Sequence, residues 1–149
     1  MTWATERLEA LQAGAITPPP VVQTMKLGLF DDWGEGWVRK SWEPCAETQN
    51  HDGSLFGGYI AALADQGMGM SCAMRLRTDG VPAANLWTSS MTVDYLGVAR
   101  PDQWLAFDTV FCRPGKTLCH AEMDITADGE TVARARAAFR VTLERAAAA

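Results

Sequence analysis

The sequence predicts one α+β domain in which a long central helix is wrapped by an antiparallel sheet of about five to six strands. Two observations predict this fold class. Residues 57–74 form an apolar segment of helical length, and residues 86–143 divide into strand-like runs separated by turn-forming residues. A chain of 149 residues with 48% hydrophobic and 21% charged residues also has the size and balance of a single globular domain.

The N-terminal residues 1–30 are predicted to form a helical arm. Trp3, Leu8 and Leu11 recur at helical spacing, and the prolines at 18–20 stop the helix because proline has no backbone N–H to donate. The main domain is expected over residues 31–145, with a half-buried first strand at 34–43. The alanines at 146–149 are expected to form a disordered tail.

Residues 57–74 read GGYIAALADQGMGMSCAM and predict a helix that is apolar on nearly every face, hence buried all round. Its internal glycines, including Gly67 and Gly69, cost about 1 kcal/mol each relative to alanine, so they indicate close approach of a sheet or of another helix. A loop is expected before the helix, at 49–56, and a polar loop after it, at 75–85.

Four further strands are expected over 86–96, 103–113, 117–126 and 131–143, and the short turns between them indicate an antiparallel meander. In the last run, small and apolar residues alternate with Arg134, Arg136 and Arg140. One face of the sheet should therefore contact the core and the other should contact solvent. We expect these arginines to form salt bridges with Glu122 and Asp124 on the neighbouring strand.

Composition and patterning exclude several classes of function. The formal net charge of −5 and the pI near 4.9 argue against a nucleic-acid partner, since phosphate binding needs a basic surface. The N-terminus lacks the features of a secretory signal, and no apolar segment is long enough to span a bilayer, so we expect a cytoplasmic protein with no membrane partner. The cysteines show no metal-binding spacing, and neither a metal nor a cofactor is predicted.

A set of short motifs follows one another along the chain in a fixed order. The set consists of Asn50, Phe56-Gly57-Gly58, Leu63-Ala64-Asp65, Thr88, Val93-Asp94-Tyr95-Leu96, Gly115-Lys116-Thr117 and Asp128-Gly129. With these motifs, over about residues 37–143, the chain resembles the PaaI-like hotdog-fold acyl-CoA thioesterases. One residue departs from the family's pattern, because the histidine before the two glycines is Phe56 here.

The resemblance implies a hotdog fold and hydrolysis of an aromatic or short- to medium-chain acyl-CoA to the free acid and CoA. It implies Asp65 as nucleophile or general base and the Gly57 backbone N–H as donor to the oxyanion. Asn50 and Thr88 are implied to position the attacking water or the thioester. The residue types suit this chemistry, since hydrolysis needs an activated nucleophile together with hydrogen-bond donors at the carbonyl oxygen.

Four more residues are predicted to contact the substrate. Phe56 and Gly58 flank the oxyanion donor at the helix start, where backbone N–H groups have no partner within the helix. Arg113 and Lys116 lie beside Gly115 in a turn, a setting that favours the binding of phosphate groups such as those of CoA.

The spacing of Gly57 and Asp65 predicts an obligate homodimer. Eight residues of helix separate them by about 12 Å along the axis, so one thioester carbon cannot contact both groups of the same chain. If both act, they come from different subunits whose helices run antiparallel across a two-fold axis. Small residues such as Ala61, Gly67 and Gly69 would permit this pairing, and further assembly into a dimer of dimers stays open.

Two other functions remain open on the sequence alone. A hotdog hydratase or dehydratase also works beside a thioester carbonyl, but it pairs a carboxylate with a histidine, which is Phe56 here. A non-catalytic acyl-CoA-binding protein is the other alternative, and the same departure at Phe56 favours it. Release of free thiol from an acyl-CoA separates these functions.

Overall fold

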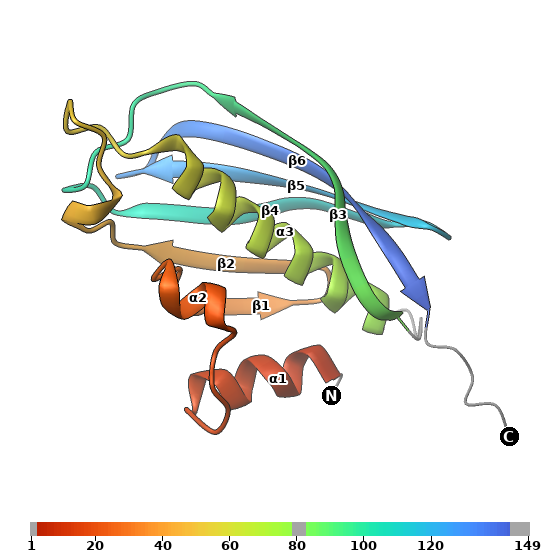
Figure 1. The fold of residues 1–149 in the computed structure, drawn as a ribbon. Helices are drawn as coiled ribbons and strands as arrows, with labels where there is room; N and C mark the ends of the chain where they lie inside the picture. The colour runs from red at the N-terminus through yellow and green to blue at the C-terminus, as the bar shows by residue number, and fades with distance from the viewer. Residues whose placement is uncertain (1–2, 79–82, 144–149) are drawn as a thin grey trace, which may run out of the picture.

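The computed structural model describes residues 3–78 and 83–143 and confirms the predicted α+β class (Figure 1). The helix α3 (Gly57–Thr78) packs against one face of a six-stranded antiparallel sheet with the order β1-β2-β4-β5-β6-β3. The strands are β1 (Asp32–Gly34), β2 (Trp37–Trp42), β3 (Ala83–Tyr95), β4 (Leu105–Pro114), β5 (Leu118–Ala127) and β6 (Glu130–Leu143). This is the arrangement expected of a hotdog fold.

Two predicted boundaries are wrong. The helix extends to Thr78, because Met74 and Leu76 are buried and because basic side chains in the last turn favour the negative end of the helix dipole. The polar loop expected at 75–85 is therefore helical as far as residue 78 and already part of β3 from residue 83. The strand expected at 34–43 is observed as β2 preceded by the short β1, whose three residues are too few to give a periodic pattern.

The N-terminal arm, residues 3–30, contains α1 (Trp3–Gln12) and α2 (Pro20–Thr24), and α2 begins at Pro20, a favoured residue for a first helical turn. Ala4, Leu8, Leu11 and Val22 are buried and belong to the same apolar core as the rest of the chain. The domain boundary at residue 30 stays a prediction. The predicted tail at 146–149 lies outside the described residues.

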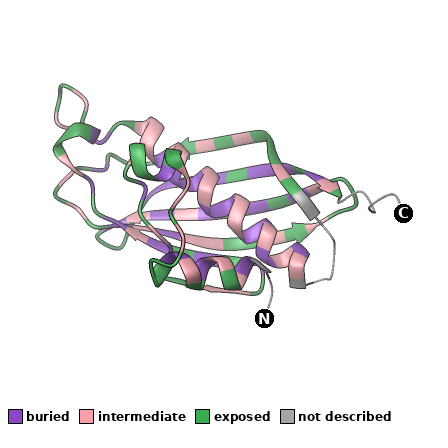
Figure 2. Cartoon of the chain, turned by 60° about the horizontal axis from the view of Figure 1, so that its bottom comes forward, coloured by how far each residue is buried: buried purple, intermediate pink, exposed green. Residues whose placement is uncertain are grey.

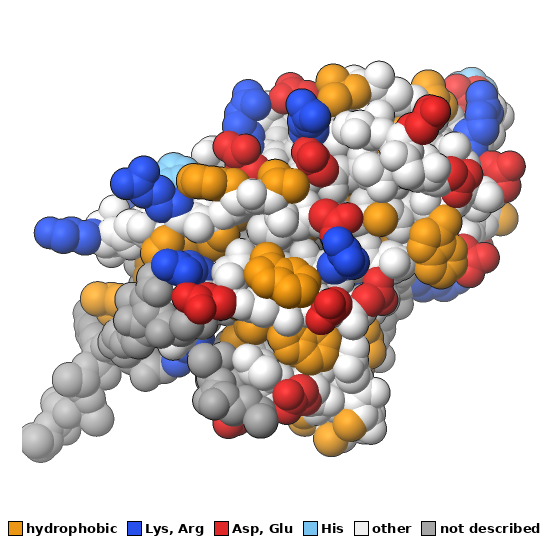
Figure 3. All heavy atoms as spheres, turned by 180° about the vertical axis from the view of Figure 1, so that it is seen from behind, with side chains coloured by type: hydrophobic (Ala, Val, Ile, Leu, Met, Phe, Trp, Pro, Cys, Tyr) orange, Lys and Arg blue, Asp and Glu red, His pale blue; other side chains and the backbone are white. Residues whose placement is uncertain are grey.

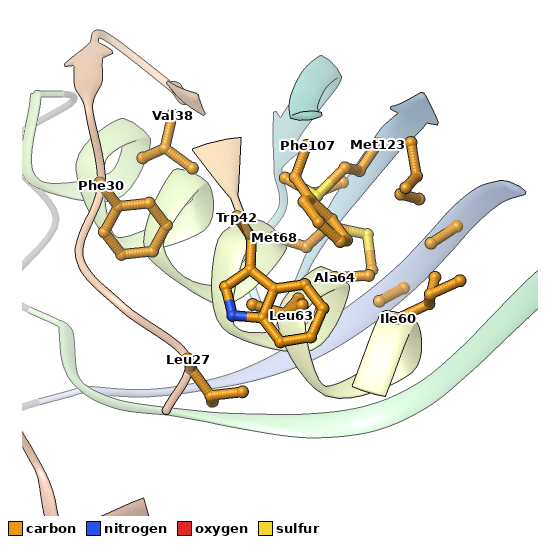
Figure 4. Packing of buried hydrophobic residues seen from close by; sticks show 14 of the residues in the cluster. Leu27, Phe30, Val38, Trp42, Ile60, Leu63, Ala64, Met68, Phe107 and Met123 are labelled. Carbon is orange, nitrogen blue, oxygen red and sulfur yellow. The ribbon is translucent and has the colours of Figure 1, made fainter. Parts of the chain in front are cut away.

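The core lies between α3 and the sheet (Figure 4), where Leu63, Met68, Phe107 and Met123 are almost wholly buried. A Cβ at Gly67 would lie 2.5 Å from Cε of Met123, and one at Gly69 would lie 3.3 Å from Phe139. These two glycines therefore permit close approach of the sheet, and their expected part in pairing two helices stays a prediction.

The helix is not buried all round within one chain. Buried and half-buried residues alternate along it (Figure 2). Leu63, Ala64 and Met68 face the sheet and are buried, whereas Asp65 and Gln66 are only half-buried. The sheet covers one side of α3, and the arm covers only part of the other. The side that the sheet leaves uncovered carries the candidate catalytic carboxylate.

The outer face of the sheet carries alternating charged side chains among apolar ones (Figure 3). Arg134 pairs with Asp124 at 3.2 Å, as expected, whereas Arg136 pairs with Asp94 of β3, also at 3.2 Å. These arginines have carboxylate partners on their own sheet, which favours a structural role for them.

Candidate active site

Asp65 and Thr88 are brought together by α3 and β3. The Thr88 hydroxyl donates a hydrogen bond of 2.7 Å to Oδ1 of Asp65, although 23 residues separate the two in sequence. The pairing of β3 with β6 shifts register between Thr88 and Ser90. Such a bulge re-aims neighbouring side chains, which accounts for a strand threonine that reaches the middle of the helix.

The Asp65–Thr88 pair lines a cavity of about 330 Å³ on the side of α3 away from the sheet centre. The lining residues are Asp65, Gln66, Gly69, Met70, Ala73, Arg77, Asn85, Leu86, Thr88 and Phe139. The second carboxylate oxygen, Oδ2, has no hydrogen-bond partner within residues 3–78 and 83–143. A carboxylate held through one oxygen and bordering a cavity can accept a proton from water or attack a carbonyl carbon.

The start of α3 is fixed by Tyr95 at the end of β3. The Tyr95 hydroxyl donates to the Gly57 carbonyl oxygen at 2.7 Å, and a Cβ at Gly57 would lie 3.1 Å from the tyrosine ring. Glycine at position 57 therefore allows the ring to pack directly against the backbone. Burial raises the pKa of the Tyr95 hydroxyl, so it stays protonated as a donor. The Gly57 N–H opens the helix and has no carbonyl four residues earlier in helical position to bind.

Phe56 and Gly58 lie beside this helix start. The Phe56 side chain is 53% exposed and makes an edge contact with Tyr59, with ring centroids 6.5 Å apart. A Cβ at Gly58 would overlap the Phe56 ring, so the two residues are matched in shape. Neither residue lines the cavity of Asp65 within this chain.

Asn50 does not reach Asp65 within the chain. Its side-chain amide donates to the Ser54 hydroxyl at 2.9 Å and more weakly to the Leu55 carbonyl at 3.5 Å, while its backbone N–H binds the Ser54 carbonyl at 2.7 Å. Asn50 thus closes the loop that precedes α3. Arg113, near the end of β4, and Lys116, in the β4–β5 turn, line a separate cavity of about 420 Å³ with His120.

Lys40 is a buried lysine next to the site that was not predicted from the sequence. Lys40 is 1% exposed, and its Nζ donates to the carbonyls of Leu27 (2.8 Å) and Gly28 (3.0 Å) and to Oε1 of Gln66 (2.5 Å). Burial lowers its pKa to about 7, although Asp31 acts in the opposite direction. The alternation of Val38, Lys40 and Trp42 on the buried face of β2 was the signal that could have revealed it.

The residues best placed to hold a metal are three free cysteines on the sheet side of α3. The sulfur atoms of Cys72, Cys112 and Cys119 all lie within 4.8 Å of one another. Hydrogen bonds from Cys119 and Cys72 hold the pKa of the Cys112 thiol below its usual value, whereas hydrogen bonds with Cys112 and Cys119, together with burial, raise the pKa of the Cys72 thiol. These residues come from α3, β4 and β5, so their sequence spacing could not reveal the cluster.

Comparison with known proteins defines the class of protein. Residues 52–134 match the thioesterase superfamily, and this is more than half of the chain, so the chain belongs to the thioesterase superfamily. A relative from Pseudomonas aeruginosa, described as a candidate esterase, is 29% identical over 92 residues, which are 62% of this chain. The chain spans 66% of that relative's length, slightly less than two thirds.

Solved structures share the fold over most of their length. The Escherichia coli PaaI protein of the phenylacetic acid degradation operon superposes with a TM-score of 0.76 at 18% identity, covering 93% of each chain. A hypothetical thioesterase from Streptococcus pneumoniae, solved with coenzyme A, superposes with a TM-score of 0.68 at 24% identity, covering 78% of this chain and 90% of the other. The expected resemblance to the PaaI-like hotdog thioesterases is confirmed. Within the described residues, no helix is long and apolar enough to cross a membrane.

Proposed function

We propose that this chain hydrolyses acyl-CoA to a free acid and CoA, with Asp65 as general base or nucleophile. The observation that carries the proposal is the hydrogen bond from Thr88 to Asp65 at the wall of a cavity. This hydrogen bond holds one carboxylate oxygen of Asp65 and leaves the other available to take a proton from water or to attack the thioester carbonyl. As general base, Asp65 takes a proton from water while the water oxygen bonds to the carbonyl carbon, the bond to sulfur breaks, and the proton passes to CoA, which leaves as a thiol. As nucleophile, Asp65 bonds to the carbonyl carbon as the bond to sulfur breaks, and water then cleaves the resulting anhydride, which releases the acid, restores the carboxylate and supplies the proton of the CoA thiol.

The oxyanion donor in this mechanism is the Gly57 N–H of a second copy of the chain. Gly57 and Asp65 are eight residues apart on one helix, about 12 Å along its axis, so they serve the same carbonyl only from different subunits. The first N–H groups of the partner helix would then stabilise the developing negative charge at the positive end of its dipole.

The edge strand β3 supports this dimer. It is 13 residues long, ends the sheet order and pairs only with β6 among the described strands. Trp87, Tyr95 and Leu96 are more than half exposed on or just after it, and a long apolar edge is usually covered by another strand. A two-fold axis normal to the sheet would pair two β3 strands antiparallel and would bring the α3 helices antiparallel as well. That is the arrangement that the Gly57–Asp65 spacing requires.

Arg113 and Lys116 remain the proposed contacts to CoA phosphates. The paired residues Thr88, Phe139, Cys119 and Pro114 form one row across β3, β6, β5 and β4. Since neighbouring strands are about 4.8 Å apart, the β4–β5 turn lies on the order of 10–15 Å from Thr88 along this row. A Streptococcus pneumoniae neighbour solved with coenzyme A and a Streptococcus mutans neighbour bound to acetyl CoA favour CoA as the carrier.

The experiment compares Asp65→Asn with Asp102→Asn in a thiol-release assay over a panel of acyl-CoA substrates. Asp102 is exposed in the turn before β4 and lines none of the cavities described above, so it is the matched control. Loss of general-base catalysis should lower kcat of the Asp65 variant at least about 100-fold, and the control should match wild type. Near-normal turnover by Asp65→Asn would refute the role of this carboxylate.

The second candidate is an acyl-CoA-binding protein that does not hydrolyse its ligand. It is favoured by Phe56, which stands where the resembling family has histidine and leaves the helix start without that polar side chain. The same assay decides between the two, because a binding protein would bind acyl-CoA by calorimetry and release no thiol. A hydratase or dehydratase would consume an unsaturated or hydroxylated acyl-CoA, again with no thiol released.

A further inference from the structure

A second cavity lies between the N-terminal arm and α3, next to the cavity of Asp65. It has a volume of about 180 Å³, and its walls come from α1, α2, the segment 28–30 and α3. Figure 2 shows α1 running beside α3 on this side of the molecule. Most of the lining is apolar and includes Leu8, Leu11, Val22, Leu29, Phe30 and Met70.

Two residues are common to the walls of the two cavities. Gln66 and Met70 line both of them, and Gln66 directly follows Asp65 in sequence. Being four residues apart on a helix, Gln66 and Met70 lie on one face and form a common wall. The Met70 side chain is unbranched and flexible, so a change of its rotamer can open a passage between the cavities.

The arm cavity is a preformed space held by polar contacts. Gln12 Nε2 donates to the Phe30 carbonyl at 2.9 Å, and Trp42 Nε1 donates to the Lys26 carbonyl at 2.9 Å. Lys40 ties the carbonyls of Leu27 and Gly28 to the side chain of Gln66. These bonds fix the segment that forms one wall of the cavity. Sites for small molecules are usually preformed and apolar in this way.

We propose that this arm cavity holds the acyl group of the substrate and that the group is a short- to medium-length aliphatic chain. The proposal rests on the proposed thioesterase activity, since the thioester carbon would lie beside Asp65 while the acyl chain passes Met70. The apolar lining suits a hydrocarbon chain, and the small volume limits its length, since sites for drug-sized ligands span about 300–1,000 Å³. The arm lies outside residues 52–134, which match the thioesterase superfamily.

The test measures kcat/KM for acetyl-, butanoyl-, hexanoyl-, octanoyl- and dodecanoyl-CoA. In wild type, each methylene that enters the cavity should raise kcat/KM about fourfold until the cavity is full. Val22→Phe places extra volume in the cavity and should lower the octanoyl- to butanoyl-CoA ratio of kcat/KM about 15-fold, equivalent to the loss of roughly two methylenes. Val110→Phe is the matched control, since Val110 is 56% exposed on β4 and lines neither cavity. Its ratio should equal that of wild type.

A second variant and a second measurement keep the outcome decisive. Leu29→Phe fills the same cavity from a half-buried position, and it replaces Val22→Phe if that variant does not fold. S-Alkyl-CoA thioethers, which cannot be hydrolysed, are titrated by calorimetry. Their affinity should rise with alkyl length in wild type and lose this rise in the filled variants.

The outcomes separate this proposal from the proposed function. A chain-length profile unchanged by both filling variants overturns the acyl pocket, even if Asp65→Asn has abolished hydrolysis. If wild type hydrolyses none of the substrates, the thioesterase proposal fails. The thioether titration then decides whether the arm cavity binds an acyl chain. Length-dependent affinity lost in Val22→Phe then supports an acyl-chain site, and length-independent affinity overturns it.

Discussion

Thr88→Val tests whether the Thr88 hydroxyl positions the candidate catalytic carboxylate. The substitution removes one hydroxyl and keeps a similar shape at a strand position. The lost bond is the 2.7 Å hydrogen bond to Oδ1 of Asp65, and hydrogen bonds to charged groups contribute about 1.5–3 kcal/mol. If that energy orients the carboxylate in the transition state, kcat/KM should fall about 10- to 100-fold, because each 1.36 kcal/mol is about tenfold in rate.

The assay is steady-state thiol release with octanoyl-CoA, in which kcat and KM are determined separately. The decrease should lie in kcat, since the hydroxyl positions the carboxylate and binds no part of CoA. Thr88→Ser keeps the hydroxyl and should restore most of kcat, which a purely structural role of the methyl group would not allow. Thr92→Val is the matched control, because Thr92 is an exposed residue of the same strand and lies outside the Asp65 cavity.

Full kcat in Thr88→Val would refute the reasoning, and so would an equal loss in Thr92→Val. The thermal midpoints of the three variants should stay close to wild type, since Thr88 and Thr92 are exposed and their replacement leaves the core intact. Activity loss without loss of stability is therefore the expected signature of a positioning residue.

Two further predictions concern Lys40 and the edge strand. The folded-state pKa of Lys40, about 7, lies below the ordinary value of 10.5, so between these values the unfolded chain binds a proton that the folded chain lacks. The free energy of unfolding should then rise with pH, by about 2 kcal/mol from about pH 7 to about pH 9 relative to Lys40→Met, as measured by urea unfolding. A difference between the two proteins that stays constant over this range would contradict it. Trp87→Glu should shift the molecule towards a monomer in light scattering and lower activity in parallel, whereas Trp104→Glu, also at an exposed tryptophan, should do neither. A fully active monomer would rule out a shared site.

The elements that periodicity defines well were predictable from the sequence. Strands β5 and β6 alternate buried and exposed residues along most of their length, and this two-residue period is a local property of the chain. The end of α3 was not predictable in the same way. The charged residues Arg75 and Arg77 suggested that a polar loop begins at residue 75. Leu76 between them is fully buried, however, and packs the last turn of the helix against the core.

The sequence singles out candidate site residues whose chemistry is unusual for their surroundings, but it does not show the contacts that tertiary packing gives them. A carboxylate within an apolar helix marks Asp65, and the bulge that brings Thr88 to it is a tertiary feature. The contacts of Asn50 were not predicted from the sequence: its amide donates to the hydroxyl of Ser54, only four residues away, and its role at the thioester stays a prediction. The role of Lys40 could not be predicted because two of its acceptors, the carbonyls of Leu27 and Gly28, belong to the arm, whose position no local pattern encodes.

The residues proposed for catalysis lie in the part of the chain that matches the thioesterase superfamily, and the arm proposed to bind the acyl group lies outside it. Asp65, Thr88, Gly57 and Lys116 all lie within the residues matched by the thioesterase superfamily, 52–134. The arm and Lys40 lie outside that range, yet Lys40 binds Gln66, the neighbour of Asp65. Gln66 and Met70 thus line both the cavity of the proposed catalytic carboxylate and the arm cavity proposed to hold the acyl group. Changes in the arm can alter acyl selection without moving the carboxylate, because Thr88 holds Asp65 from the opposite side, through β3.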